Sequence, residues 1–166
     1  NANELINKKE HSNDDTKIVY LFRIDREFYH RFNFLKNERA IRQKKYDEYN
    51  SHIFIIMLKV VEESLKEKGI YENATEIFKQ IVNKRGKRKK NSRTVAKDRL
   101  EELTIYLPSE QSDNYLNCFY SHVKNNPNED INDTSFSKNY FFNDVMDIVS
   151  ENKSKFYKYK SFDNEN

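Results

Sequence analysis

Ile53-Phe54-Ile55-Ile56-Met57-Leu58-Lys59-Val60-Val61 is the longest nearly uninterrupted apolar stretch of the chain, and it decides the fold class. A helix that is apolar on almost every face lies inside a protein, and this stretch is far shorter than the roughly 20 residues of a membrane span. Lys66 and Lys68 suit the negative end of a helix dipole, and Gly69 can adopt the left-handed conformation that ends a helix. We therefore predict a central helix over about residues 45–68, within a helical segment that begins near Glu38.

The segment before this stretch fits two kinds of secondary structure. Over residues 16–35, large apolar side chains recur close to every third or fourth position, which is typical of a helix buried along one stripe. From Ile18 to Ile24 the apolar residues also occupy every second position, which suits a short strand. Both interpretations stay open for residues 16–24, and we favour the helix.

Further helices are predicted after the central one. Asn73-Ala74-Thr75-Glu76 has the form of a capping box, in which Asn73 accepts a hydrogen bond from the first turn of a short helix. Helices are also predicted at about residues 110–124 and 136–149. Between the short helix and the one at 110–124, a helix that starts at Ser92 or Thr94 would end at Pro108. Its buried stripe would consist of Ala96, Leu100, Leu103 and Leu107.

These segments predict an all-α fold, a single domain of five to six helices packed around the central apolar helix at about 45–68. The helical domain would span residues 16–152 and carry a basic loop at 84–93, between a flexible polar N-terminus (1–15) and a basic and aromatic C-terminal tail (153–166). A chain of 166 residues buries roughly two-thirds of its unfolded surface, so one contiguous core is expected. The residues predicted to lie in that core are Ile53, Ile56, Met57, Val60, Phe78, Leu103, Leu116 and Phe119.

No pattern in the sequence indicates catalysis or a bound cofactor. The chain has no glycine-rich phosphate loop, no dinucleotide fingerprint, no metalloprotease motif and no nucleophile elbow. The single cysteine, Cys118, lies among apolar residues, which indicates a buried thiol rather than a nucleophile. The sequence therefore predicts no catalytic, cofactor-binding or metal-binding residues, since the histidines at His11, His30, His52 and His122 have no ligand spacing.

The most concentrated charge in the sequence lies in residues 84–93. This segment holds seven positive side chains and no acid; without it, 23 basic residues remain against 27 acidic ones, a net charge of −4. Such a run can contact nucleic-acid phosphates, act as a nuclear import signal, or be a solvated connection between helices. The candidate contacts with a partner or a nucleic acid are Lys84, Arg85, Lys87, Arg88, Lys89, Lys90 and Arg93.

Two other segments bear on function. In the tail, Phe156, Tyr157 and Phe162 alternate with lysines and could stack on bases, although packing within the last element is the commoner role. Residues 106–136, from Tyr106-Leu107-Pro108-Ser109 to Phe136, resemble the opening of the fungal transcription-factor middle homology region. The zinc cluster of that family is absent here, and the resemblance implies a nuclear protein.

The sequence as a whole favours a binding protein over an enzyme. We expect a non-enzymatic helical protein–protein interaction module, an adaptor or assembly subunit of an intracellular complex whose partner is another protein. The lone cysteine and the absence of a secretory signal indicate a reducing compartment, with the nucleus as one possibility, and no membrane span is predicted. The alternative is a nucleic-acid-binding or chromatin-associated domain that uses segment 84–93.

Overall fold

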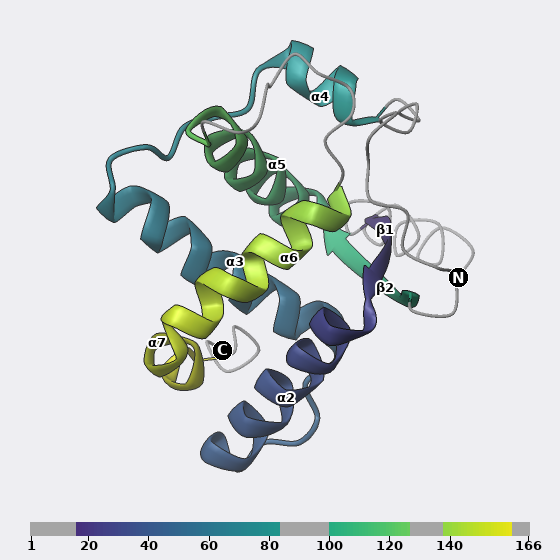
Figure 1. Ribbon diagram of the computed structural model, residues 1–166, viewed down its shortest axis with the longest axis vertical. Coiled ribbons are helices and arrows are strands. Elements are labelled where there is room, and N and C mark those ends of the chain that lie inside the picture. The colour runs from purple at the N-terminus through teal and green to yellow at the C-terminus, as the bar shows by residue number, and fades with distance from the viewer. Residues whose placement is uncertain (1–15, 84–99, 127–137, 161–166) are drawn as a thin grey trace, which may run out of the picture.

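The computed structural model describes residues 16–83, 100–126 and 138–160. These residues form six helices and a two-stranded antiparallel sheet, so the chain is mostly helical, as predicted, with a small sheet in addition (Figure 1). In chain order the elements are β1 (Lys17–Asp25), α2 (Arg26–Gln43), α3 (Asn50–Glu67), α4 (Glu76–Asn83), β2 (Leu100–Pro108), α5 (Ser109–Lys124), α6 (Lys138–Glu151) and α7 (Lys153–Lys158).

The sheet corrects the preference for helix in two places. Residues 17–25 form strand β1 rather than the first turns of a helix, and residues 100–107, predicted as helix, belong to strand β2. The alternating pattern prevails because each strand buries every second side chain: Phe22 and Ile24 in β1, and Leu103, Ile105 and Leu107 in β2. The helix predicted to end at Pro108 was expected to start at Ser92 or Thr94. These two residues and Ala96, which was expected on its buried stripe, lie outside the described residues.

The helical segment predicted from Glu38 to Lys68 is two helices. The first of them, α2, already begins at Arg26. Asp25 caps it, because the Asp25 Oδ1 accepts a hydrogen bond from the Glu27 N–H at 3.3 Å. Helix α2 ends at Lys44, whose backbone is left-handed (φ 54°), and α3 begins at Asn50. A buried ion pair joins Arg39 Nε to Glu48 Oε1 at 3.0 Å and holds the connecting turn against α2.

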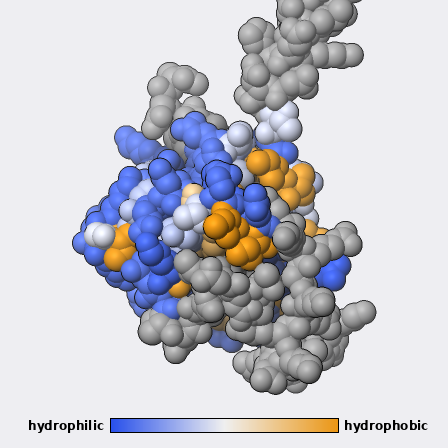
Figure 2. Space-filling view, turned by 90° about the horizontal axis from the view of Figure 1, so that it is seen from above, coloured by the Kyte–Doolittle hydropathy of each residue, from blue (hydrophilic) through white to orange (hydrophobic). Residues whose placement is uncertain are grey.

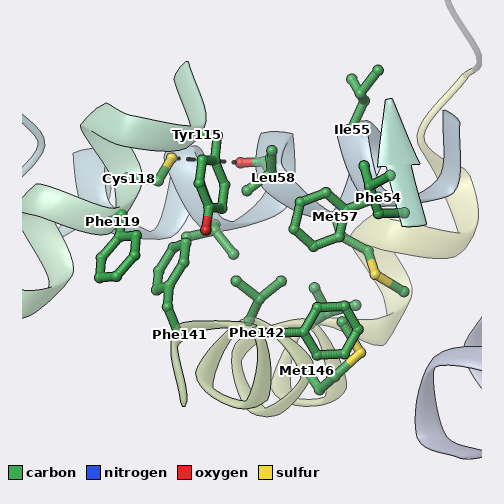
Figure 3. Close-up of a cluster of buried hydrophobic side chains, with 14 of the residues drawn as sticks. Phe54, Ile55, Met57, Leu58, Tyr115, Cys118, Phe119, Phe141, Phe142 and Met146 are labelled. Atoms are coloured by element: carbon green, nitrogen blue, oxygen red, sulfur yellow. Dashed lines mark hydrogen bonds between the residues drawn. The ribbon is translucent and has the colours of Figure 1, made fainter. Parts of the chain in front are cut away.

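Helix α3 contributes the largest share of the apolar core. All side chains from Ile53 to Leu58 are buried, and the helix packs against α5, α6, α7 and β2. Figure 3 shows Phe54 and Leu58 facing aromatic rings from α5 and α6, with Phe141 stacked on Phe119 at 4.6 Å between centroids. The burial predictions are confirmed for Ile53, Ile56, Met57, Val60, Phe78, Leu103, Leu116 and Phe119.

Two helix ends test the capping predictions. Gly69 ends the region of α3 with φ 70°, and the Ile70 N–H reaches back to the Leu65 carbonyl at 3.0 Å, as the sequence predicted for a glycine cap. At α4 the predicted cap is wrong by two positions. Thr75 Oγ1, rather than the side chain of Asn73, accepts from the helix, at 3.1 Å from the Phe78 nitrogen.

Helix α7 lies against α2 and α3. The Arg39 guanidinium donates to the Phe156 carbonyl at 2.6 Å, and the Gln43 amide donates to the Tyr157 and Tyr159 carbonyls, both at 2.8 Å. Phe156 and Tyr157 are buried, so these two aromatic rings pack in the domain and are not available to stack on bases. Phe162 lies outside the described residues.

None of the helices in the described ranges is long and apolar enough to cross a membrane.

Candidate functional site

The basic residues that the sequence singled out lie in the segment between α4 and β2, outside the described residues. The structure therefore neither brings them together nor separates them, and the phosphate-binding role stays a prediction. These residues are Lys84, Arg85, Lys87, Arg88, Lys89, Lys90 and Arg93.

The thiol of Cys118 and the imidazole of His122 lie in positions that suit a role in the fold. Cys118 is fully buried on α5, where its Sγ lies 3.9 Å from the Leu58 carbonyl, and burial raises the pKa of its thiol far above the ordinary value. His122 Nε2 lies 2.8 Å from Asp144 Oδ2 and links α5 to α6. Within residues 16–83, 100–126 and 138–160, no cluster of three or more histidine, cysteine or carboxylate side chains could hold a metal ion.

The surface of the described residues is largely hydrophilic, with a few separate hydrophobic clusters, as Figure 2 shows for one face. One apolar group lies on the face of the sheet opposite the core. Val19, Leu21 and Tyr106 are 57%, 37% and 48% exposed, and we call these three residues the outer sheet surface. A sheet with one face on the core normally carries polar side chains on the other face, so this apolar composition is unusual.

The strand register makes the outer sheet surface continuous. Val19 lies directly opposite Tyr106, and Leu21 lies opposite Thr104, so the apolar side chains of β1 and β2 are neighbours across the strands. Beside them, Arg23 lies opposite Glu102 and forms an exposed ion pair, with 3.4 Å between Arg23 Nε and Glu102 Oε1. The surface therefore consists of an apolar part bordered by a charged cross-strand pair.

The outer edge of β1 carries backbone groups that β2 does not use. The Arg23 N–H donates to Asn139 Oδ1 of α6 at 3.0 Å, so it points away from β2. Backbone groups alternate in direction along an antiparallel strand, so the N–H and C=O groups of Val19 and Leu21 also point away from β2. No hydrogen bond to either residue on this side occurs within the described part of the chain. We call residues 17–21 the free edge of β1.

Positive charge lies at both ends of the free edge. Lys17 begins β1, and Lys138, the first residue of α6, lies close enough to Arg23 for the two charges to interact. Burial and the nearby Arg23 charge lower the pKa of Lys138. Neither lysine forms an ion pair with a carboxylate in the ranges that the structure describes, whereas Arg23 has Glu102 and Arg26 has Glu101.

Sequence reasoning missed this site because it favoured a helix over a strand for residues 16–24 and placed the residues of β2 in a helix. The signal was present in the alternation from Ile18 to Ile24 and again from Leu103 to Leu107, where every second residue is apolar. The residues that alternate with these apolar ones, including Val19 and Tyr106, would then have been assigned to the opposite face of a sheet.

Comparisons of the chain with protein-family models, with curated proteins and with solved structures found no match.

Proposed function

We propose that this chain is a non-enzymatic protein-binding module, an adaptor or assembly subunit, and that it binds its partner through the outer sheet surface and the free edge of β1. The observation that carries the proposal is the pairing of Val19 with Tyr106 on an exposed sheet face. Exposed apolar groups rimmed by polar residues are typical of protein interaction sites, and aromatic residues such as Tyr106 are enriched at the centres of such interfaces.

Other features of the chain support binding rather than catalysis. The single thiol is buried, and His122 links two helices. Two exposed hydrophobic side chains on α2, Phe34 and Ile41, give a weaker candidate, since they lie seven positions apart on one helix. The sheet instead presents side chains from two strands together with free backbone groups, which offers a partner both apolar contact and hydrogen bonding.

We further propose that α3 is the helix around which the domain is built, and that the protein works in a reducing intracellular compartment. The burial of Ile53 to Leu58 and the contacts of α3 with four other elements support the first proposal. The single unpaired thiol of Cys118 supports the second, because disulfides are characteristic of oxidising compartments.

Photo-crosslinking in the protein's own cells tests the binding surface. A benzophenone amino acid at position 106 should give a crosslinked adduct with a specific protein, and the same group at position 34, where Phe34 is 53% exposed on α2, should not. Val19→Thr with Leu21→Thr should abolish the adduct, because threonine keeps the strand preference while removing apolar contact area. Equal crosslinking from positions 106 and 34, or none from position 106, would show that the partner does not bind at the outer sheet surface.

A further inference from the structure

We propose that the partner adds an extended segment alongside the free edge of β1 as a third strand, and that acidic side chains at the two ends of this segment meet Lys17 and the Arg23–Lys138 pair. This inference rests on the proposed function and specifies the partner's chemistry. The free edge supplies the backbone groups, the outer sheet surface supplies the apolar contacts, and the two lysines supply the charge.

The backbone of β1 provides the hydrogen bonds that a third strand needs. Val19 and Leu21 each present one N–H and one C=O group outward, and a strand that pairs with them extends the sheet from two strands to three. Asn139 ends the available edge, because its side chain occupies the Arg23 N–H. The partner strand is therefore short, and it runs beside residues 17–21 without extending past Arg23.

Side chains on the outer face select the sequence of that strand. Every second residue of the partner would lie on the same face as Val19, Leu21 and Tyr106, and apolar residues at these positions would continue the outer sheet surface. The intervening residues would lie on the side of Ile18, which is 43% exposed, so polar side chains there would stay in contact with water. An alternating apolar and polar segment thus fits the edge better than a uniformly apolar one.

Electrostatics selects the ends of the strand. Lys17 and Arg23 are six positions apart, about 20 Å along a strand. Lys138 lies beside Arg23, and burial together with the Arg23 charge lowers the pKa of Lys138. A carboxylate of the partner would offset the repulsion between these two positive charges. A segment with carboxylates spaced by about this distance would compensate both ends at once.

The same charges argue against a second copy of this chain at the edge. Two β1 strands paired antiparallel about a two-fold axis would bring Lys17 of one copy toward Arg23 and Lys138 of the other. Like charges placed across a strand pair are destabilising. An acidic extended segment of a different protein therefore suits the edge better than self-association does.

Selection from a displayed library of random peptides on the immobilised wild-type chain tests the inference. Enriched peptides should alternate apolar and polar residues and carry Asp or Glu at both ends. Lys138→Glu should weaken their binding on the order of tenfold, and charge-reversed peptides should recover it. Lys153→Glu is the matched control, because Lys153 is the exposed first residue of α7, a helix that packs on α2 and α3, and this change should leave binding unaltered.

Backbone chemistry distinguishes strand addition from docking onto the outer face alone. N-methylation of the peptide amides that face β1 should abolish binding, whereas methylation of the alternate amides should not. In hydrogen exchange, the Val19 and Leu21 amides should be fast in the free protein and slow by at least about tenfold in the complex, while those of Tyr20 and Phe22 are slow in both.

Several outcomes would overturn the inference. These are failure to enrich acidic alternating peptides, binding that is indifferent to Lys138→Glu or to N-methylation, and a concentration-dependent dimer of this chain in which the Val19 and Leu21 amides become slow to exchange. If position 106 still crosslinks to a partner in cells while the peptide selection fails, the strand-addition inference is wrong and protein binding through the outer sheet surface stands. If both experiments fail, the proposed function falls as well.

Discussion

Two tyrosines of the domain differ in whether their hydroxyl groups are hydrogen-bonded. Tyr115 is fully buried among aromatic rings, and within the described residues its hydroxyl has no hydrogen-bond partner (Figure 3). The Tyr71 hydroxyl donates to Asn114 Oδ1 at 2.7 Å. A buried hydroxyl without a partner costs stability, whereas a hydrogen-bonded one contributes to it.

Removing each hydroxyl should therefore have a different effect. Tyr115→Phe should leave the free energy of unfolding unchanged or raise it, whereas Tyr71→Phe should lower it by about 1 kcal/mol. Urea denaturation of the two variants beside the wild type measures both values. A larger loss for Tyr115→Phe than for Tyr71→Phe would show that the Tyr115 hydroxyl has a partner.

Burial of Cys118 and Tyr115 also predicts a loss of stability at alkaline pH. Burial raises the pKa of both groups above their ordinary values of 9.0 and 10.0, so the folded state holds these protons more tightly than the unfolded state does. This contribution is complete below the ordinary pKa of each group and is lost as the pH rises above it. The free energy of unfolding should fall from about pH 9 upward, and less steeply in Tyr115→Phe, which calorimetry across that range would show.

At the level of elements, the end of α3 depends on one backbone conformation. Gly69 has φ 70°, and a Cβ atom built there would meet nothing within 4 Å, so a side chain would be opposed by backbone geometry alone. Gly69→Ala should lower the free energy of unfolding by about 1–2 kcal/mol. Gly69→Asn should cost less, because asparagine tolerates the left-handed region better. Thermal denaturation of the pair tests this, and equal losses would contradict a purely conformational cause.

The sequence predicted the helices well and the strands poorly, for a physical reason. Leu100, Leu103 and Leu107 fit one stripe of a helix, while Leu103 and Leu107 with Ile105 between them fit one face of a strand. The choice depends on β1, which supplies the neighbouring strand from the other half of the chain. Local spacing contains no information about that partner.

The break between α2 and α3 shows the same limit. The segment from Glu38 to Lys68 has no proline or glycine to mark a stop, so it was predicted as continuous helix. In the structure, Arg39 and Glu48 meet as a buried ion pair, and Arg39 also bonds to the carbonyl of Phe156, which is distant in sequence. These tertiary contacts, rather than residue preferences, hold the turn between the helices.

Across the whole molecule, the burial of core residues in α3 and α4 predicts how truncations will act. Ile53→Ala, Ile56→Ala and Phe78→Ala should each lower the free energy of unfolding by about 2–5 kcal/mol, because each leaves a cavity in a closely packed core. Ile41→Ala is the control, since Ile41 is 60% exposed and should change stability by less than about 0.5 kcal/mol. If the melting temperatures of the Ile53→Ala and Ile56→Ala variants match the wild type, the role proposed for α3 is wrong, and a match for Phe78→Ala would contradict the packing of α4 on the core.

The charge distribution of the molecule separates the two candidate functions. Nucleic-acid binding through segment 84–93 requires an affinity that falls steeply with salt, and Arg88→Ala, Lys89→Ala and Lys90→Ala together should flatten that dependence. We expect weak binding of labelled DNA and RNA near physiological salt, because the rest of the chain is net negative. Sub-micromolar binding there, lost in the triple variant, would favour the nucleic-acid role over the protein-binding one.

The sequence predicted only part of the candidate site, because the rest is formed by residues that are distant in sequence. A charged segment such as 84–93 is visible in any window of the sequence. The outer sheet surface exists only once Val19 and Tyr106, 87 positions apart, are placed opposite each other. A site built by tertiary pairing leaves no contiguous motif.

The distance in sequence between β1 and β2 has a consequence during protein synthesis. The ribosome makes β1 first, and the closest paired residues, Asp25 and Leu100, are separated by 75 positions. At typical rates of elongation, β1 waits on the order of 4–15 s for its partner strand. Throughout that interval the nascent chain exposes the apolar segment from Ile18 to Ile24 with both of its edges open, which makes it a natural substrate for chaperones that bind extended apolar peptides.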